Sequence, residues 1–146
     1  MKIGIDARLL GPKTAGGGLG RYIKELVINL QRIDRENEYF LFLRKSNWHE
    51  ASETTNFHKI LADIPWYSAR EQTELPRLVR RAGCELMHYT HFNVPLFDKT
   101  PFVVTIHDLI LLEHPSTRAT TLGPIIYGIK YAAYRRILGH AVSRSR

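Results

Sequence analysis

A short β-branched segment, a glycine-rich loop and an amphipathic helix follow one another at the N-terminus, and this order constrains the fold most. Residues Lys2–Asp6 predict a strand that ends in a carboxylate. Glycine, proline and small side chains fill residues 7–19, which predicts a loop. Apolar residues then recur at 3.6-residue spacing over residues 20–35, which predicts a helix. This order is typical of the first unit of a parallel α/β sheet.

Strands and helices continue to alternate along the chain. Residues 68–82 predict a helix that Ser68 caps and Gly83 ends, with Pro76 kinking it or dividing it in two. Residues 120–138 predict a second long helix, because they carry an apolar stripe of Leu122, Ile125, Ile126, Ile129, Ala133 and Ile137. Apolar runs predict further strands at residues 39–44, 57–61, 85–88 and 102–106, and residues 141–143 resemble the start of one more strand.

We therefore expect the α/β class, with a Rossmann-like parallel sheet that carries helices on both faces. The 146 residues correspond to one domain, 1–146, which we expect to be incomplete at its C-terminal end. A single cysteine, Cys84, cannot form an intrachain disulfide, and no apolar run approaches the ~20 residues of a membrane span. These features predict a cytoplasmic protein.

The charge balance favours anionic partners. Lysine and arginine total 21 and acidic residues total 14, for a net charge of +7. Nucleotides, phosphorylated sugars and anionic lipid surfaces fit this balance, and a solvated basic surface explains it equally well. Nucleic acid is not an expected partner, because neither an aromatic-and-basic strand motif nor a recognition-helix motif is present.

The glycine-rich loop does not match two familiar phosphate-binding motifs. In the dinucleotide pattern G-x-G-x-x-G, the third glycine would fall on Arg21 or Ile23. In the phosphate loop of nucleoside triphosphatases, Gly17 and Gly18 stand where Lys-Ser/Thr is required. Glycines directly before a helix still allow a close backbone approach to an anion, so we interpret this loop as ligand-binding rather than as a simple linker.

Two histidine-containing segments follow neighbouring predicted strands, and we expect both at the sheet edge that carries the glycine loop. They are His88-Tyr89-Thr90-His91-Phe92-Asn93-Val94-Pro95 and Thr105-Ile106-His107-Asp108. Their spacing matches no metalloenzyme motif, so no metal site is expected. His107 is a candidate acid or base, or simply a histidine hydrogen-bonded at a strand end, and the adjacent Asp108 should point away from it.

Taken together, these segments resemble the N-terminal domain of glycosyltransferase family 4, in its mannosyltransferase-like branch. The matching stretches cover nearly the whole chain in the family's order, although Cys84-Glu85 replaces the more common Pro-Asp. They are Ile-Gly-Ile-Asp-Ala-Arg (3–8), Gly-Gly-Leu-Gly-Arg-Tyr (17–22), Ser-Ala-Arg-Glu-Gln-Thr-Glu-Leu-Pro-Arg-Leu (68–78), residues 88–95 and Val-Val-Thr-Ile-His-Asp-Leu (103–109).

The resemblance implies a GT-B fold, in which two Rossmann-like domains face a cleft. In this family the C-terminal domain holds the nucleotide-sugar and the N-terminal domain binds the acceptor. The match carries the donor phosphate and sugar contacts to the amides of Gly17 and Gly18, and the donor-sugar histidine to His107. It also makes Arg21, His91, Asn93 and Asp108 acceptor-side candidates. The family retains anomeric configuration and needs no bound metal or other cofactor.

The resemblance further implies that this chain lacks the C-terminal donor domain and the last strands of the first. We expect it to supply the acceptor-side half of a retaining hexosyl transfer to a saccharide or lipid-linked acceptor. The isolated chain should be inactive, with a separate C-terminal domain chain as a partner and peripheral membrane contact as a further option. The alternative is a non-catalytic remnant or binding module that pairs with a glycosyltransferase or an anionic surface.

Overall fold

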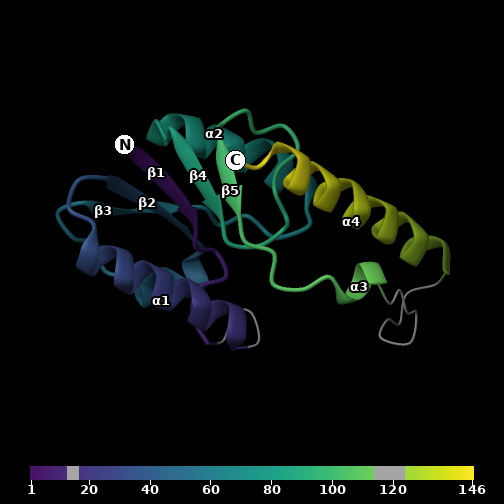
Figure 1. Cartoon of the computed structure of the whole chain (residues 1–146), viewed down its shortest axis with the longest axis horizontal. Helices are drawn as coiled ribbons and strands as arrows, with labels where there is room; N and C mark the ends of the chain where they lie inside the picture. Colours follow the sequence, from purple (N-terminus) through teal and green to yellow (C-terminus); the bar gives the residue numbers. More distant parts are fainter. Residues whose placement is uncertain (13–16, 114–123) are drawn as a thin grey trace.

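Five parallel strands form one sheet in the order β3-β2-β1-β4-β5, which confirms the predicted α/β fold (Figure 1). The computed structural model describes residues 1–12, 17–113 and 124–146. The predicted strands up to residue 106 are present with small changes in their bounds. They are β1 (Lys2–Asp6), β2 (Glu38–Leu43), β3 (Phe57–Leu61), β4 (Leu86–Tyr89) and β5 (Phe102–Val104).

Helices cover both faces of the sheet. Helix α1 (Gly18–Ile33) lies on one face, and α2 (Ala69–Ala82) lies on the other together with the end of α4 (Pro124–Arg144) (Figure 1). Each face has its own apolar core, because alternate strand residues point to opposite sides. Ile5 and Leu41 pack against Ile23 of α1, whereas Phe42 and Met87 pack with the α2 side.

The two predicted ends of α2 are confirmed. The Ser68 hydroxyl accepts a hydrogen bond from the Glu71 N–H at 3.2 Å, and Gly83 ends the helix with a left-handed φ of 70°. Of the two effects predicted for Pro76, a kink or a division of the helix, the division is not observed, because α2 runs unbroken from Ala69 to Ala82. Pro76 is buried there, so packing on the sheet offsets the backbone hydrogen bond that proline cannot donate.

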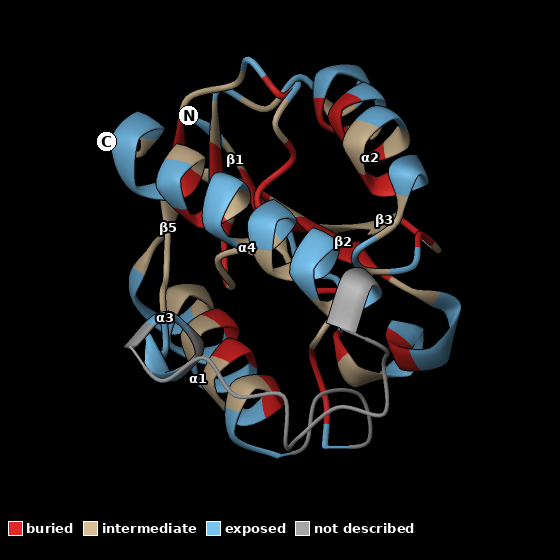
Figure 2. Cartoon of the chain, turned by 90° about the vertical axis from the view of Figure 1, so that its right-hand side faces the viewer, coloured by how far each residue is buried: buried red, intermediate tan, exposed pale blue. Residues whose placement is uncertain are grey.

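The C-terminal prediction needs correction. Residues 141–143 are not a strand but belong to the last turn of α4, and Ala141 is buried against the sheet. The C-terminal end of α4 meets β5, where the Arg146 N–H donates to the Phe102 carbonyl at 2.9 Å. Nearer the start of α4, Ile126 and Ile129 are 50% and 66% exposed, so these two members of the predicted stripe do not cover the sheet. Much of the surface of α4 is exposed (Figure 2).

Other differences concern short elements. The 3₁₀ helix η1 (Lys45–Glu50) and the single-turn helix α3 (Ile110–Glu113) have no counterpart among the predicted elements. Residues 120–123 of the predicted last helix, with Leu122 of its stripe, lie outside the described residues. Within the described ranges, no helix combines the length and apolar composition that crossing a membrane requires.

A close backbone contact joins the loop after β1 to α1. A Cβ atom placed on Gly20 would lie 2.2 Å from the Gly11 carbonyl oxygen, which is far inside van der Waals contact. Gly11 itself has a φ of 102°, a conformation that side chains with a Cβ rarely adopt. By contrast, a Cβ on Gly18 would meet open space. Gly11 and Gly20 therefore allow the first turn of α1 to approach this loop closely.

We expect Gly20→Ala to lower the free energy of unfolding by about 1–3 kcal/mol, because the new methyl group must push the Gly11 backbone away. Urea denaturation followed by circular dichroism measures this change. Gly18→Ala is the matched control two residues earlier in the same helix. It should leave stability unchanged or raise it by up to about 1 kcal/mol. Equal effects of the two substitutions would contradict the role given to the Gly11–Gly20 contact.

Candidate functional site

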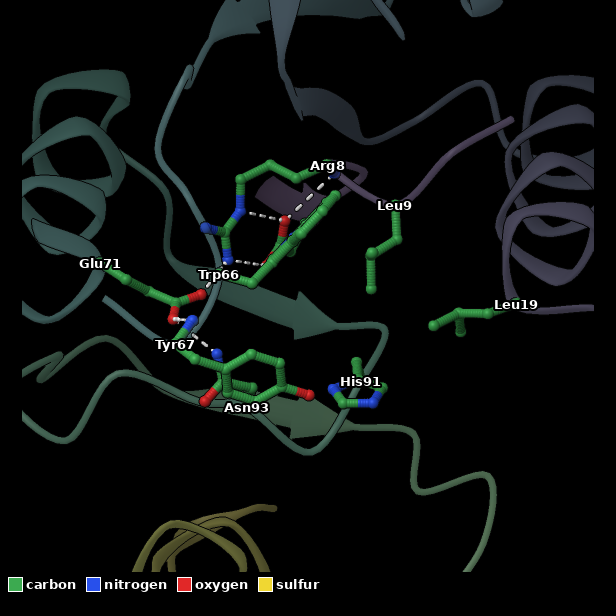
Figure 3. A pocket seen from close by; sticks show the side chains of 9 residues that line it. Arg8, Leu9, Leu19, Trp66, Tyr67, Glu71, His91 and Asn93 are labelled. Atoms are coloured by element: carbon green, nitrogen blue, oxygen red, sulfur yellow. Dashed lines mark hydrogen bonds and ion pairs between the residues drawn. The ribbon is translucent and has the colours of Figure 1, made fainter. Parts of the chain in front are cut away.

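The strand order reverses at β1, with β2 and β3 on one side and β4 and β5 on the other. In open parallel sheets, ligands bind outside the carboxyl ends of the strands at such a switch point. A pocket of about 220 Å³ opens at this position, and we call it the switch-point pocket (Figure 3). Its walls come from the end of β1 and the loop after it, the start of α1, the loop before α2, the first turn of α2 and the loop after β4. The lining residues are Asp6, Arg8, Leu9, Leu19, Trp66, Tyr67, Glu71, His91 and Asn93.

A buried ion cluster forms the floor of this pocket. The Arg8 side chain is 1% exposed, and its guanidinium binds Asp6 through two hydrogen bonds of 2.9 and 2.7 Å. The same group donates to Glu71 Oε1 at 2.6 Å and to the Ile64 carbonyl at 3.3 Å. Burial acts to lower the pKa of Arg8, but the Asp6 and Glu71 carboxylates outweigh it and raise that pKa above its ordinary value.

Glu71 connects three segments of the chain. Its Oε2 accepts the Tyr67 backbone N–H at 2.9 Å and the Asn93 side-chain amide, while Oε1 faces Arg8. Burial raises the pKa of Glu71, and the charge and hydrogen bond of Arg8 act in the opposite direction. All three partners donate hydrogen bonds, which suits an ionised carboxylate. Two carboxylates therefore share one guanidinium, and the cluster carries net negative charge.

The aromatic residues before α2 stand over the cluster. Tyr67 has a φ of 56°, which is unusual for a residue other than glycine and costs about 1–3 kcal/mol. The hydrogen bond from its N–H to Glu71 holds this conformation, and the ring lies beside His91 with ring centres 6.5 Å apart. The indole ring of Trp66 packs against the Arg44 guanidinium at 4.9 Å. A strained aromatic residue is therefore fixed at the pocket by the ion cluster.

The two predicted donor-binding glycines lie next to the pocket. Gly17 has a φ of 91° and is the N-cap of α1; as a glycine it has no side chain to cap the helix, and among the described residues no side-chain cap is present for the first amides. Leu19, which follows Gly18, lines the pocket itself. Gly16 of the predicted loop lies outside the described residues.

His107 follows β5 and is exposed. Its Nε2 lies 2.9 Å from the Thr90 carbonyl oxygen, which can only accept, so Nε2 carries the proton and Nδ1 is the acceptor of the neutral ring. The Tyr22 ring of α1 packs edge-on against it with ring centres 4.9 Å apart. The hydrogen bond to Thr90 is one that a purely structural histidine at a strand end would make. Because this bond uses Nε2, the Nδ1 atom could still bind a ligand.

Two further histidines connect the neighbouring strands. His91 lines the pocket, and burial and then the nearby His107 lower its pKa. His88 Nε2 lies 2.9 Å from the Thr105 hydroxyl, which also meets the Tyr22 hydroxyl at 2.8 Å. Burial lowers the pKa of His88. The predicted gathering of both histidine segments at one sheet edge with α1 is therefore observed.

Only one of the other three predicted acceptor-side residues lines the switch-point pocket. Asn93 is 6% exposed and lines the pocket. Arg21 and Asp108 are exposed and are not among the described residues that line it. Asp108 Oδ1 instead accepts the Ile110 N–H at 3.2 Å at the start of α3, so its side chain is turned to the following residues, as its position beside His107 predicted.

The sequence reasoning named none of Arg8, Glu71 and Asn47 as site residues. The Asn47 side-chain amide reaches the carbonyl oxygens of Ala7, Arg8 and Leu10 at 2.9–3.2 Å and fixes the path of the loop after β1. An arginine within the otherwise apolar Ala-Arg-Leu-Leu segment was the available signal.

Comparisons with protein-family models, with curated proteins and with solved structures found no match.

We expect Arg8→Met to lower the free energy of unfolding by about 3–5 kcal/mol, because the buried Glu71 carboxylate and the partly buried Asp6 carboxylate then lose their cation. The double variant Arg8→Met/Glu71→Gln should be less destabilised than the single variant, since it removes one of those charges while the glutamine carbonyl still accepts from Tyr67 and Asn93. Arg70→Met breaks the exposed Arg70–Glu74 pair on α2 and serves as the control, with stability within error of the parent. A double variant that is less stable than Arg8→Met would contradict this account.

We expect the stability to depend on pH through His88. Because burial lowers its pKa in the folded chain, the unfolded chain binds the proton first as the pH falls below the ordinary value of 6.5. The His88 contribution to stability is therefore complete above pH 6.5 and is lost as the pH falls through the lower folded-state pKa. His88→Gln should flatten the decline in unfolding free energy between about pH 7 and 5, measured by urea denaturation. Parallel curves for the two proteins would refute this assignment.

Proposed function

We propose that this chain supplies the acceptor-side half of a retaining glycosyltransferase. It would take part in transfer of a hexose from a nucleotide-sugar to a saccharide or lipid-linked acceptor in the cytoplasm. A separate chain or domain would hold the nucleotide-sugar, and no metal or other cofactor is proposed. The observation that carries the proposal is the switch-point pocket, where the α1 N-terminus on one side faces His91 and Asn93 on the other.

The arrangement suits the chemistry of glycosyl transfer. A departing nucleoside diphosphate needs hydrogen-bond donors, and the first turn of α1 at Gly17 and Gly18, which no described side chain caps, offers backbone amides. The transition state carries positive charge on the sugar, which the net negative cluster of Asp6, Arg8 and Glu71 favours. His107 would contact the transferred sugar or the incoming hydroxyl through Nδ1, while its Nε2 remains bound to Thr90.

The second candidate is a non-catalytic module that binds a glycosyltransferase or an anionic surface. The exposed apolar side chains Ile110, Ile126, Ile129 and Val142 favour this candidate, because such surface is commonly covered by a partner. The basic residues Lys130 and Arg135 of α4 would favour an anionic membrane as the partner.

The test is glycosyl transfer after the chain is mixed with the donor-binding C-terminal domain of a family 4 glycosyltransferase. Each half alone should give no transfer from a radiolabelled nucleotide-sugar, and the mixture should give product. Gly18→Val should abolish this activity, because the added side chain blocks approach to the α1 amides, while circular dichroism stays unchanged. Gly128→Val, at an equally open glycine of α4, is the matched control and should retain activity.

In the same assay, His107→Ala should lower the rate by about 10²- to 10⁴-fold if His107 moves a proton. His49→Ala, which changes an exposed histidine on η1, is its control. Full activity of the Gly18→Val or His107→Ala mixture would overturn the corresponding site assignment. A mixture without activity, tested with several donor domains, would favour the binding module.

A further inference from the structure

A line of hydrogen bonds joins α1 to the ends of β4 and β5 beside His107. The Tyr22 hydroxyl of α1 lies 2.8 Å from the Thr105 hydroxyl, which lies 2.9 Å from Nε2 of His88 on β4. The Thr105 backbone N–H also donates to the Tyr89 carbonyl at 2.9 Å, so Thr105 is fixed beside β4. These bonds tie the Tyr22 side chain to the segment that carries His107 two residues further on.

The imidazole of His107 is exposed, and two contacts hold it. Its Nε2 bonds to the Thr90 carbonyl at 2.9 Å. A single hydrogen bond fixes one atom of a ring but leaves the plane of the ring free to turn about that atom. The Tyr22 ring supplies the second contact, edge to face, with ring centres 4.9 Å apart and the two planes at 76°. Thr90 and Tyr22 together therefore define both the place and the plane of the imidazole.

Tyr22 is itself held at both ends of its side chain. Its ring packs against the apolar core between the sheet and α1, and its hydroxyl is bound to Thr105. A partly buried tyrosine whose hydroxyl has a partner is a fixed surface for a neighbouring ring. Tyr22 also lies one turn after Gly18 on α1, so it relates His107 to the backbone amides at the start of that helix.

We propose that Tyr22 is a positioning residue for His107. Its ring, anchored through Thr105, keeps the imidazole in the orientation that bonds Nε2 to Thr90 and leaves Nδ1 for the transferred sugar or the incoming hydroxyl. A reacting group that is already oriented spares the reaction the cost of ordering it. Tyr22 acts only through His107. This inference rests on the proposed function, because it adds to that reaction a residue that orients its histidine.

The order of the His107 ring in the isolated chain tests the positioning without any substrate. Carbon-13 relaxation of the imidazole C–H groups gives an order parameter for motion on the picosecond-to-nanosecond timescale. Tyr22→Leu removes the ring contact and should lower this order parameter below about 0.6, the range of flexible groups. Thr105→Val removes only the anchoring hydroxyl and should lower it less, whereas Thr105→Ser keeps a hydroxyl and should preserve it.

Tyr39→Phe is the matched control. Tyr39 belongs to the same apolar core, and its hydroxyl donates to Asp34 at 2.6 Å, at the C-terminal end of α1. Losing this bond should lower stability but leave the His107 ring as ordered as in the parent. An unchanged order parameter in Tyr22→Leu, or an equal decrease in Tyr39→Phe, would overturn the proposal. If circular dichroism shows that Tyr22→Leu is unfolded, equal ring order in Thr105→Val and Thr105→Ser overturns it instead.

Transfer in the mixed assay tests whether this orientation matters for the reaction. Tyr22→Leu should lower kcat by up to about 10²-fold, while the KM for the nucleotide-sugar changes little. In a chain that already carries His107→Ala, it should cost no further rate, because no imidazole remains to be positioned. Equal losses with and without His107 would show a general structural role and overturn the proposal, as would a full rate in Tyr22→Leu.

The two measurements separate this proposal from the proposed function. Active transfer with an unchanged His107 ring order in Tyr22→Leu would reject the role of Tyr22 and leave the proposed function. If the unmodified chain gives no transfer with several donor domains, the proposed function fails. The ring order in Tyr22→Leu then decides alone whether Tyr22 holds His107.

Discussion

The bond between the Arg8 guanidinium and the Asp6 and Glu71 carboxylates is the interaction on which the rest of the site depends. Asp6 ends β1, and Glu71 belongs to the first turn of α2, so the three charges join elements that are more than sixty residues apart. Through Glu71 the cluster also holds the strained Tyr67 and orients Asn93. Separating the charges of such a cluster would leave a buried charge unpaired, at a large cost in free energy. The end of β1, the loop after it and α2 therefore keep one relative position.

The sheet topology explains why these groups meet at all. Parallel strands bring their carboxyl ends to one edge, and the reversal of strand order at β1 leaves space there between α1 and the loops after β4 and β5. A hydrogen bond from the Thr90 hydroxyl to the Asp6 carbonyl, at 2.7 Å, closes the gap between the two central strand ends. The pocket is thus a property of the fold, and its side chains decide which ligand it suits.

Most of the fold follows from local signals, and part of the site does not. The strands, the Ser68 cap and the Gly83 stop each depend on neighbours within a few residues, so the sequence predicted them. The gathering of His91 and His107 follows from their places after two parallel strands, whose carboxyl ends share one edge of the sheet. The roles of Arg8, Glu71 and Asn47 depend on partners far along the chain, which no local pattern contains. The last turn of α4 was predicted as a strand because Ala-Val-Ser has no decisive local preference for helix or strand. In the structure this turn continues α4, whose C-terminal end contacts β5.

The attachment of α4 at its C-terminal end has a consequence for how the molecule opens. Leu138 and Ala141 are buried and the Arg146 amide bonds to β5, whereas Ile126 and Ile129 lie in solvent. Local unfolding begins where few apolar contacts must be broken, so amide protons near Ile129 should exchange with solvent long before those near Ala141. The helix would then fray from its first turns toward its anchored end, so the turn that contacts β5 would be the last to open.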